Sequence, residues 1–249
     1  MPFLYFSPHY DDVALSCGGL VWQQTQSGEP VTILTLCGGE PPSLGVSPFA
    51  ESLHQRWGSG VEAVRQRKQE DVASCELLGV SYVHLSLPDC IYRLGVNGEP
   101  LYDSEESLWQ DLHPSENHLV DDLFEQINQL PMLTNRSLHL VSPLTLGGHV
   151  DHRLTRKIVE KLALARPLRP WHYADYPYAA QQPDLLPQLL PSGSQVVAFP
   201  ISEPALEAWI QSIAAHASQL STFWPDEESL RQSIRSYRDA CQGIRLWRI

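Results

Sequence analysis

The chain has 249 residues, of which 43% are hydrophobic and 18% are charged, a composition typical of a folded globular protein and not of a disordered one. This length suits one large α/β domain or two small ones. Seventeen Lys and Arg against 29 Asp and Glu give a net charge of −12, which argues against a nucleic-acid partner because phosphate binding depends on clustered positive charge.

The first part of the chain alternates short apolar runs with longer helical patterns. Three of the short runs are predicted to be strands: Phe3–Ser7, Val31–Cys37 and Tyr82–Leu87. Two longer segments, each ended by a glycine, are predicted to be helices: 11–27 and 61–78. Residues 40–60 have no clear period and are predicted to be a loop at the rim of a binding pocket. Residues 89–114 are predicted to be an irregular insertion.

The same alternation continues to the end of the chain. Three further strands are predicted: 138–142, 171–175 and 195–199. Four further helices are predicted: 116–130, 149–165, 203–223 and 227–240. This order predicts a single Rossmann-like α/β domain over residues 1–249, with a mostly parallel sheet that carries helices on both faces. The last helices, about residues 203–240, are expected to pack on that domain.

The cysteines and the apolar runs indicate the cellular compartment of the protein. The five cysteines are odd in number and widely spaced, without a CxxC pair, so neither a disulfide framework nor a thiolate zinc site is expected. No uninterrupted apolar run approaches the ~20 residues of a membrane-spanning helix, and the first six residues lack a basic signal segment. We therefore expect a cytoplasmic protein without a membrane partner.

Two predicted strand ends carry dense polar clusters, at residues 7–12 and 147–152. Ligands of open α/β sheets bind beyond the carboxyl ends of the strands. His9 and Asp12 stand three residues apart, as do His149 and His152, and this spacing can aim both side chains of a pair at one point. Catalytic zinc typically takes three nitrogen or oxygen ligands and a water molecule. The two clusters together therefore predict a metal site, beside which an aspartate would act as a general base.

Each cluster taken alone also has a purely structural interpretation. Asp11 and Asp12 stand where a helix begins, and aspartate is common there as an N-cap or as a partner of the helix dipole. His149, Asp151 and His152 also begin a helix, where they would serve as hydrogen-bonded surface groups. The joint occurrence of His and carboxylate at two strand ends favours the metal site.

The two clusters resemble the motifs of a known family. The segment 7–12 (Ser-Pro-His-Tyr-Asp-Asp), followed by Leu-Ser-Cys-Gly-Gly at 15–19, resembles the (A/S)-H-P-D-D motif of the PIG-L/LmbE-like zinc N-deacetylases. The segment 149–152 (His-Val-Asp-His) is similar to that family's H-x-D-H motif. Residues 67–70, with Leu-Gly at 78–79, resemble its R-x-x-E…L-G helix, and residues 216–219 its late Ser-Gln segment. The resemblance covers roughly residues 1–220.

The resemblance implies a role for each residue of the two motifs. His9, Asp12 and His152 would bind one zinc ion per chain, with another divalent metal left open. Asp11 would be the general base, and His149 the acid or the electrostatic partner of the oxyanion, oriented by Asp151.

Three further residues are candidates for substrate binding. Arg67 and Asp89 match positions that contact sugar hydroxyls in relatives, although either would also suit an ordinary surface charge. Tyr10 stands where relatives have proline, and we expect it either to stack on a sugar ring or to fill the space between the first strand and its loop.

The implied function is zinc-dependent hydrolysis that removes an acetyl group from an N-acetylglucosamine-like sugar or conjugate, a small-molecule partner. Two alternatives remain open: an amidase for a non-sugar or thiol-conjugate amide, and a non-catalytic sugar-binding protein. Whether the chain forms a homo-oligomer is also left open. A dinucleotide cofactor and a serine hydrolase are disfavoured, because neither G-x-G-x-x-G after the first strand nor G-x-S-x-G occurs in the sequence.

Overall fold

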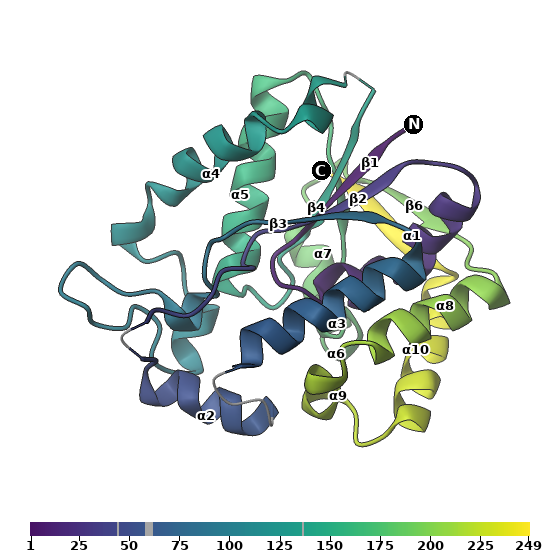
Figure 1. Cartoon of the computed structure of the whole chain (residues 1–249). Coiled ribbons are helices and arrows are strands. Elements are labelled where there is room, and N and C mark those ends of the chain that lie inside the picture. Colours follow the sequence, from purple (N-terminus) through teal and green to yellow (C-terminus); the bar gives the residue numbers. More distant parts are fainter. Residues whose placement is uncertain (44, 58–61, 136) are drawn as a thin grey trace.

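The computed structural model describes residues 1–43, 45–57, 62–135 and 137–249, and its centre is one seven-stranded sheet (Figure 1). The strands are β1 (Phe3–Ser7), β2 (Val31–Thr35), β3 (Ser81–His84), β4 (His139–Pro143), β5 (Trp171–Tyr173), β6 (Gln195–Phe199) and β7 (Ile244–Arg248). Their order is β3-β2-β1-β4-β5-β7-β6, and β7 runs antiparallel to the other six strands. The prediction of an α/β fold on a mostly parallel sheet is confirmed.

Helices cover both faces of this sheet (Figure 1). The helices on one face are α1 (Asp12–Gln26), α3 (Ala63–Leu78), α8 (Glu203–Ala214) and α10 (Glu227–Cys241). Those on the other face are α4 (Leu119–Asn128) and α5 (Val150–Ala165). Successive residues of a strand serve opposite cores: Leu4 and Phe6 pack with α4 and α5, whereas Tyr5 packs with the helices of the first face. The central strands β1, β2 and β4 are therefore rich in apolar residues on both faces.

The strand order places a ligand site between β1 and β4. The chain moves outward in one direction from β1 through β2 to β3, and in the other direction from β4 to β5. This reversal is the topological switch point, at which the loops after β1 and β4 separate and leave a crevice. The two His/Asp clusters of the sequence follow these two strands, so both lie at that crevice.

Helix α8 holds the beginning of α1 through one tryptophan. Trp209 is fully buried, and its indole Nε1–H donates to the carbonyl oxygen of Ala14 at 2.9 Å. The close approach of α8 to α1 requires a glycine opposite the indole, because a Cβ on Gly18 would lie 2.7 Å from a Trp209 ring carbon. The helix that carries Asp12 is therefore fixed by a segment almost 200 residues away in the sequence.

Three segments differ from their predicted structure. The predicted loop 40–60 contains a helix, α2 (Pro48–Trp57), because Ala50 and Leu53 give it an apolar face that is buried on the body of the protein. The predicted helix 203–223 is divided into α8 and α9 (Ala217–Phe223), with the break at His216. Strand β7 was not predicted. The predicted helix start at Val61 and the predicted loop end at Gly60 lie outside the described residues.

Short helical turns complete the chain: α6 (Tyr178–Gln181), α7 (Leu186–Leu189) and the 3-10 turns at 90–92, 106–109, 114–116, 131–134 and 183–185. The insertion 89–114 is irregular apart from the turns at 90–92 and 106–109 and the start of the turn at 114–116. Within the described ranges, no helix combines the length and apolarity needed to cross a membrane.

Candidate active site

The turn after β1 is built so that His9 and Asp12 face the crevice. Ser7 ends the strand, and its Oγ–H donates to the carbonyl oxygen of His9 at 2.6 Å while its oxygen accepts the Val13 N–H at 3.2 Å. These two bonds close residues 7–13 into a tight turn that enters α1. The Asp12 carboxylate then accepts the backbone N–H of His9 at 2.7 Å. The turn therefore presents an imidazole and a carboxylate side by side.

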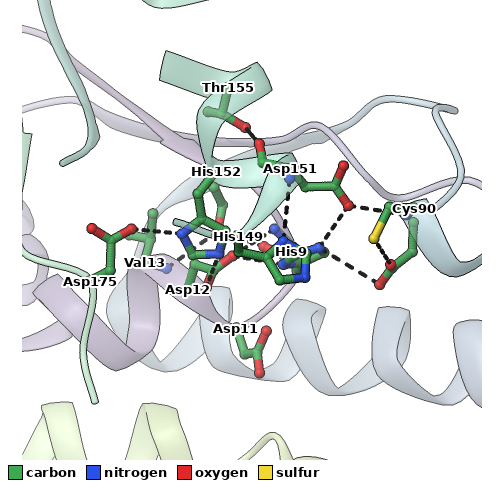
Figure 2. Close-up of polar contacts among 12 residues, drawn as sticks. His9, Asp11, Asp12, Val13, Cys90, His149, Asp151, His152, Thr155 and Asp175 are labelled. Carbon is green, nitrogen blue, oxygen red and sulfur yellow. Dashed lines mark hydrogen bonds and ion pairs between the residues drawn. The ribbon is translucent and has the colours of Figure 1, made fainter. Parts of the chain in front are cut away.

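The three predicted metal ligands lie together (Figure 2). Asp12 Oδ2 is 3.2 Å from His9 Nδ1, and Asp12 Oδ1 is 3.3 Å from His152 Nε2. One carboxylate thus bridges two imidazoles that come from the loops after β1 and β4. His9, His149 and His152 also place nitrogen atoms within 4.8 Å of one another. Two imidazoles and a carboxylate form a donor set suited to zinc.

Asp175 orients His152 from behind, and sequence analysis did not identify it. The Asp175 carboxylate lies 2.6 Å from His152 Nδ1 (Figure 2). It also accepts the Leu146 N–H at 2.8 Å. A carboxylate at Nδ1 keeps the proton there and leaves the Nε2 lone pair free, which is the usual arrangement of a metal-binding histidine. Asp175 is the second residue after β5, the strand next to β4, so its position at the carboxyl edge of the sheet was an available signal.

The charges around His152 also favour a bound cation. Burial opposes a charge on this ring, but Asp12 and Asp175 outweigh it and raise the pKa of His152 to about 10. The two buried carboxylates therefore require a positive charge between them, which a proton or a metal ion can supply. The residues present fit a divalent metal on this ground as well as on their donor chemistry.

The Asp11 carboxylate faces the cavity and does not cap the described backbone of α1. It occupies the N-cap position of α1, yet its side chain makes no capping hydrogen bond to the described backbone. Its Oδ1 instead lies 3.4 Å from Arg67 Nη2, and the carboxylate lines the same cavity as His9, Asp12 and His152. The alternative in which Asp11 only caps the helix is therefore not supported.

His149 and Asp151 interact differently from the expectation that Asp151 orients His149. The Asp151 carboxylate contacts His9 Nε2 at 3.1 Å and Arg93 Nη1 at 2.6 Å, and it accepts the Cys90 N–H at 3.0 Å. Only its backbone N–H reaches His149, donating to Nδ1 at 3.2 Å. The reason is Arg93, a buried cation from the irregular insertion that pairs with this carboxylate and holds it beside His9.

The protonation of His149 follows from these contacts. Burial, together with the nearby His9, lowers the pKa of His149 to about 3, so the ring is neutral at physiological pH. Because Nδ1 accepts a backbone N–H, the neutral ring carries its proton on Nε2. His149 therefore offers an N–H donor at the cavity, which suits the electrostatic role better than that of an acid.

Of the three predicted substrate-binding residues, Arg67 and Asp89 line the cavity and Tyr10 does not. Arg67 and Asp89 are both buried at the cavity wall, with Arg67 Nη1 3.6 Å from Asp89 Oδ2, so neither is an ordinary surface charge. Tyr10 is only 3% exposed, donates its hydroxyl hydrogen to the Gly38 carbonyl at 2.9 Å and packs on His84. The stacking prediction for Tyr10 is wrong, because the turn directs this ring into the core under the loop.

The two remaining family-like segments bind each other. Glu70, the last residue of the R-x-x-E segment, accepts the backbone N–H of Ser218 at 3.0 Å and its hydroxyl hydrogen at 2.7 Å. This contact joins α9 to α3, just after the break in the predicted long helix at His216. It places Gln219 in the wall of the cavity.

The cavity above the site has a volume of about 200 Å³ and an aromatic rim. Trp57 stacks with Arg67, whose guanidinium carbon lies 5.1 Å from the ring centroid. Trp109 meets His149 edge-on at 5.4 Å and Tyr178 at 5.6 Å between ring centroids. Sequence analysis missed Trp57 and Trp109, since both belong to segments without a periodic pattern. The floor of the cavity is thus charged and its rim aromatic.

Fold and site together define an α/β protein with a His/carboxylate centre at the carboxyl edge of a parallel sheet, in the position of a metal-dependent hydrolase site. Residues 4–163 match the family model described as PIG-L, GlcNAc-PI de-N-acetylase. The chain belongs to this family, so the resemblance inferred from the two motifs is confirmed.

The chain is similar to several characterised proteins. It is 31% identical over 196 residues to a 2'-N-acetylparomamine deacetylase of Niallia circulans, which covers 74% of this chain and 70% of that protein. It is 28% identical to a 1D-myo-inositol 2-acetamido-2-deoxy-alpha-D-glucopyranoside deacetylase of Corynebacterium glutamicum, over 62% of this chain and half of that protein. These relatives are N-deacetylases, which hydrolyse a linear amide.

The fold is also that of a solved deacetylase. The zinc-inhibited form of a teicoplanin deacetylase superposes with a TM-score of 0.84 over 100% of this chain and 97% of that chain, at 24% identity. This likeness extends to the whole chain, whereas the family model ends at residue 163.

Proposed function

We propose that this protein is a zinc-dependent deacetylase that removes the acetyl group from an N-acetylglucosamine-like sugar or its conjugate. The observation that carries the proposal is the Asp12 carboxylate between His9 and His152, with Asp175 behind the second ring. The related deacetylases support the reaction type.

His9, Asp12 and His152 would hold one zinc ion per chain, and Asp175 would keep His152 in the binding tautomer. The same nitrogen and oxygen donors would also accept another divalent metal. When bound, zinc acts as a Lewis acid and lowers the pKa of a water molecule.

Asp11 and His149 move or hold the protons of the reaction. Oδ1 of Asp11 is occupied by Arg67, which leaves Oδ2 to take the proton of the attacking water and to pass it on to the leaving amine. Nε2–H of His149 donates to the amide oxygen as negative charge develops on it, because this ring is neutral and held by the Asp151 backbone. Asp151 itself acts as a positioning residue for His9.

Arg67 and Asp89 would bind the sugar hydroxyls. Both are charged, buried at the cavity wall and within reach of the reacting centre. A substrate without hydroxyls would leave them unpaired, which disfavours the simple amide as substrate. The aromatic rim formed by Trp57 and Trp109, rather than Tyr10, would provide the apolar surface for a sugar ring.

Metal analysis combined with a deacetylation panel tests this proposal. The purified protein should contain about one zinc ion per chain and release acetate from N-acetylglucosamine or its glycosides faster than from a simple N-acetyl amine of similar size. Equal rates on both would favour the non-sugar amidase. A zinc-free protein that binds these sugars without hydrolysis would favour the non-catalytic alternative.

We further propose that residues 1–249 act as one deacetylase domain that includes helices 203–240, and that the protein works in a reducing cytoplasm. The first is supported by the bonds from Trp209 to α1 and from Ser218 to α3. The second is supported by the five cysteines, all of which are free thiols. The surplus of negative charge supports a small-molecule substrate over nucleic acid.

A further inference from the structure

The His9 imidazole has a carboxylate beside each of its two nitrogen atoms (Figure 2). Its Nδ1 lies 3.2 Å from Asp12 Oδ2, on the side of the proposed metal ligands. Its Nε2 lies 3.1 Å from Asp151 Oδ2. A neutral imidazole carries its hydrogen on one nitrogen and a lone pair on the other, so the ring can offer a metal only one side at a time. The carboxylate that holds the hydrogen therefore decides on which side a metal binds.

Asp151 also belongs to two other sets of possible metal ligands. It lies with His9 and Cys37 in one set and with His149 and Cys90 in the other, and the donor atoms of each set are within 4.8 Å of one another. Each set includes a thiol, which zinc accepts as thiolate and which softer metals prefer. A metal bound in either set would take His9 or His149 away from its proposed role. Because Asp151 is common to both, a group that occupies its carboxylate blocks both sets.

Arg93 is the group that occupies the Asp151 carboxylate. Its Nη1 lies 2.6 Å from Asp151 Oδ1, and among the residues that the structure describes it is the one lysine or arginine in ion-pair contact with Asp151. Asp151 is fully buried and Arg93 is 6% exposed, so solvent screens their attraction little. A metal ion at Asp151 would be repelled by this guanidinium, and the carboxylate already has the counter-charge that burial demands.

The residues behind Arg93 fix its guanidinium in this direction. Arg93 Nε lies 2.8 Å from Glu116 Oε1, and Glu116 Oε2 accepts the hydroxyl hydrogen of Tyr102 at 2.6 Å. The Tyr102 ring also lies against the guanidinium, with its centroid 5.2 Å from the guanidinium carbon. Glu116 and Tyr102 are both buried. The cation that faces Asp151 is therefore held from two sides.

We propose that Arg93 is a positioning residue that directs the metal to the Nδ1 side of His9. It holds and neutralises Asp151, which keeps the hydrogen of His9 on Nε2 and prevents metal binding by the two thiol-containing sets. This inference rests on the proposed zinc-dependent function and adds to it a residue that is not a ligand.

Cobalt binding in the absence of oxygen tests the inference, because a thiolate bound to Co²⁺ gives an intense near-ultraviolet charge-transfer band. The native protein should bind about one cobalt ion per chain without this band. In Arg93→Gln the freed Asp151 should recruit cobalt to a thiol-containing set, so the band should appear. Arg93→Lys restores the positive charge and should remove the band again. A band in the native protein, or no band in folded Arg93→Gln, would overturn the inference.

A second variant covers the case in which Arg93→Gln does not fold, since that change leaves two buried carboxylates without a cation. Arg93→Gln/Glu116→Gln removes one charge of each sign, so the net charge of the buried network stays the same. It should show the same band, and a folded double variant without the band would overturn the inference.

Arg156→Gln is the matched control. Arg156 is a partly buried arginine on α5, the helix that carries Asp151, but it pairs with Glu160. This variant should bind cobalt as the native protein does. A thiolate band here as well would mean that the loss of any neighbouring arginine has this effect, which would overturn the role of Arg93.

Replacing both thiols isolates the effect of Arg93 on the proposed metal centre. Adding Cys37→Ser and Cys90→Ser to Arg93→Gln should abolish the band, and a band that persists would overturn the assigned ligand sets. This triple variant should bind zinc ~10–100-fold more weakly than Cys37→Ser/Cys90→Ser, because Asp151 is no longer fixed at His9 Nε2. Equal zinc affinities in a chelator competition would overturn the inference.

These measurements do not depend on hydrolysis, so the two proposals can fail separately. A native protein that binds one cobalt ion but releases acetate from no N-acetyl sugar would overturn the proposed function alone. An active native enzyme whose folded Arg93→Gln variant shows neither the band nor a loss of zinc affinity would overturn this inference alone.

Discussion

Replacing Asp175 by asparagine tests the metal centre through a residue that is not itself a ligand. In the native protein both carboxylate oxygens accept a hydrogen bond, one from His152 Nδ1–H at 2.6 Å and one from the Leu146 N–H at 2.8 Å. An amide has one acceptor oxygen and one NH₂ group, so Asp175→Asn satisfies only one of these donors. If the amide oxygen keeps the Leu146 N–H, the NH₂ group faces His152 Nδ1 and disfavours the binding tautomer. If the oxygen turns to His152, the Leu146 N–H loses its partner and the side chain that orients His152 is held less firmly.

The size of the expected loss of zinc affinity follows from the usual contribution of such a partner. Partners of metal-binding histidines typically contribute 10–100-fold to metal affinity, which corresponds to about 1.4–2.8 kcal/mol. We therefore expect Asp175→Asn to weaken zinc binding by ~10–100-fold. Competition against a chelator of known affinity measures this, with circular dichroism to establish that the variant is folded.

Asp184→Asn is the matched control, because Asp184 is an exposed acid outside the site, and it should bind zinc as the native protein does. An Asp175→Asn variant that is folded and binds zinc with native affinity would refute the argument. In that case His152 would not depend on Asp175, or it would not be a ligand.

Four further predictions concern the same cavity. Asp11→Asn should keep zinc but lower kcat by ~10²–10⁴-fold, and near-normal turnover would remove Asp11 as the base. His152→Ala should lose zinc while His149→Ala retains it, as measured by metal analysis, and equal losses would mean that the two histidines are misassigned. The apparent zinc affinity of the metal-free protein should rise at least ~10-fold per pH unit between pH 6 and 8. The reason is that the pKa of His152 is about 10, so a proton must leave this ring before zinc binds. An affinity that does not change with pH would contradict this. Arg67→Ala should reduce the preference for N-acetylglucosamine over a simple N-acetyl amine with zinc content unchanged, and an unchanged preference would show that Arg67 does not read hydroxyls.

The positions of the proposed metal ligands were predictable because local rules determine them. A strand end, a proline and a tight turn before the helix place His9 and Asp12 together, and parallel strands bring His152 to the same edge. These features act over a few residues or follow from the handedness of α/β folds, so a single sequence contains them.

The side-chain partners of the site were less predictable, because they depend on distant segments. Asp151 turns to His9 since Arg93 from the irregular insertion holds it there, and Tyr10 turns into the core since the Gly38 carbonyl accepts its hydroxyl. Neither segment has a hydrophobic period that would reveal its path. Helix α2 and strand β7 were missed for a related reason: each is short, and tertiary packing outweighs its local pattern.

The place of β7 in the sheet has a consequence for the order in which the protein matures. Strand β5 has three residues and pairs with β7 through Tyr173, two residues before Asp175. During synthesis the segment that carries His9, Asp12 and His152 leaves the ribosome long before residues 244–248. The edge of β5 stays unpaired until then, and the backbone that presents Asp175 to His152 is incomplete. Because contacts so distant in sequence form late, the nascent chain is expected to capture its metal only near the end of folding.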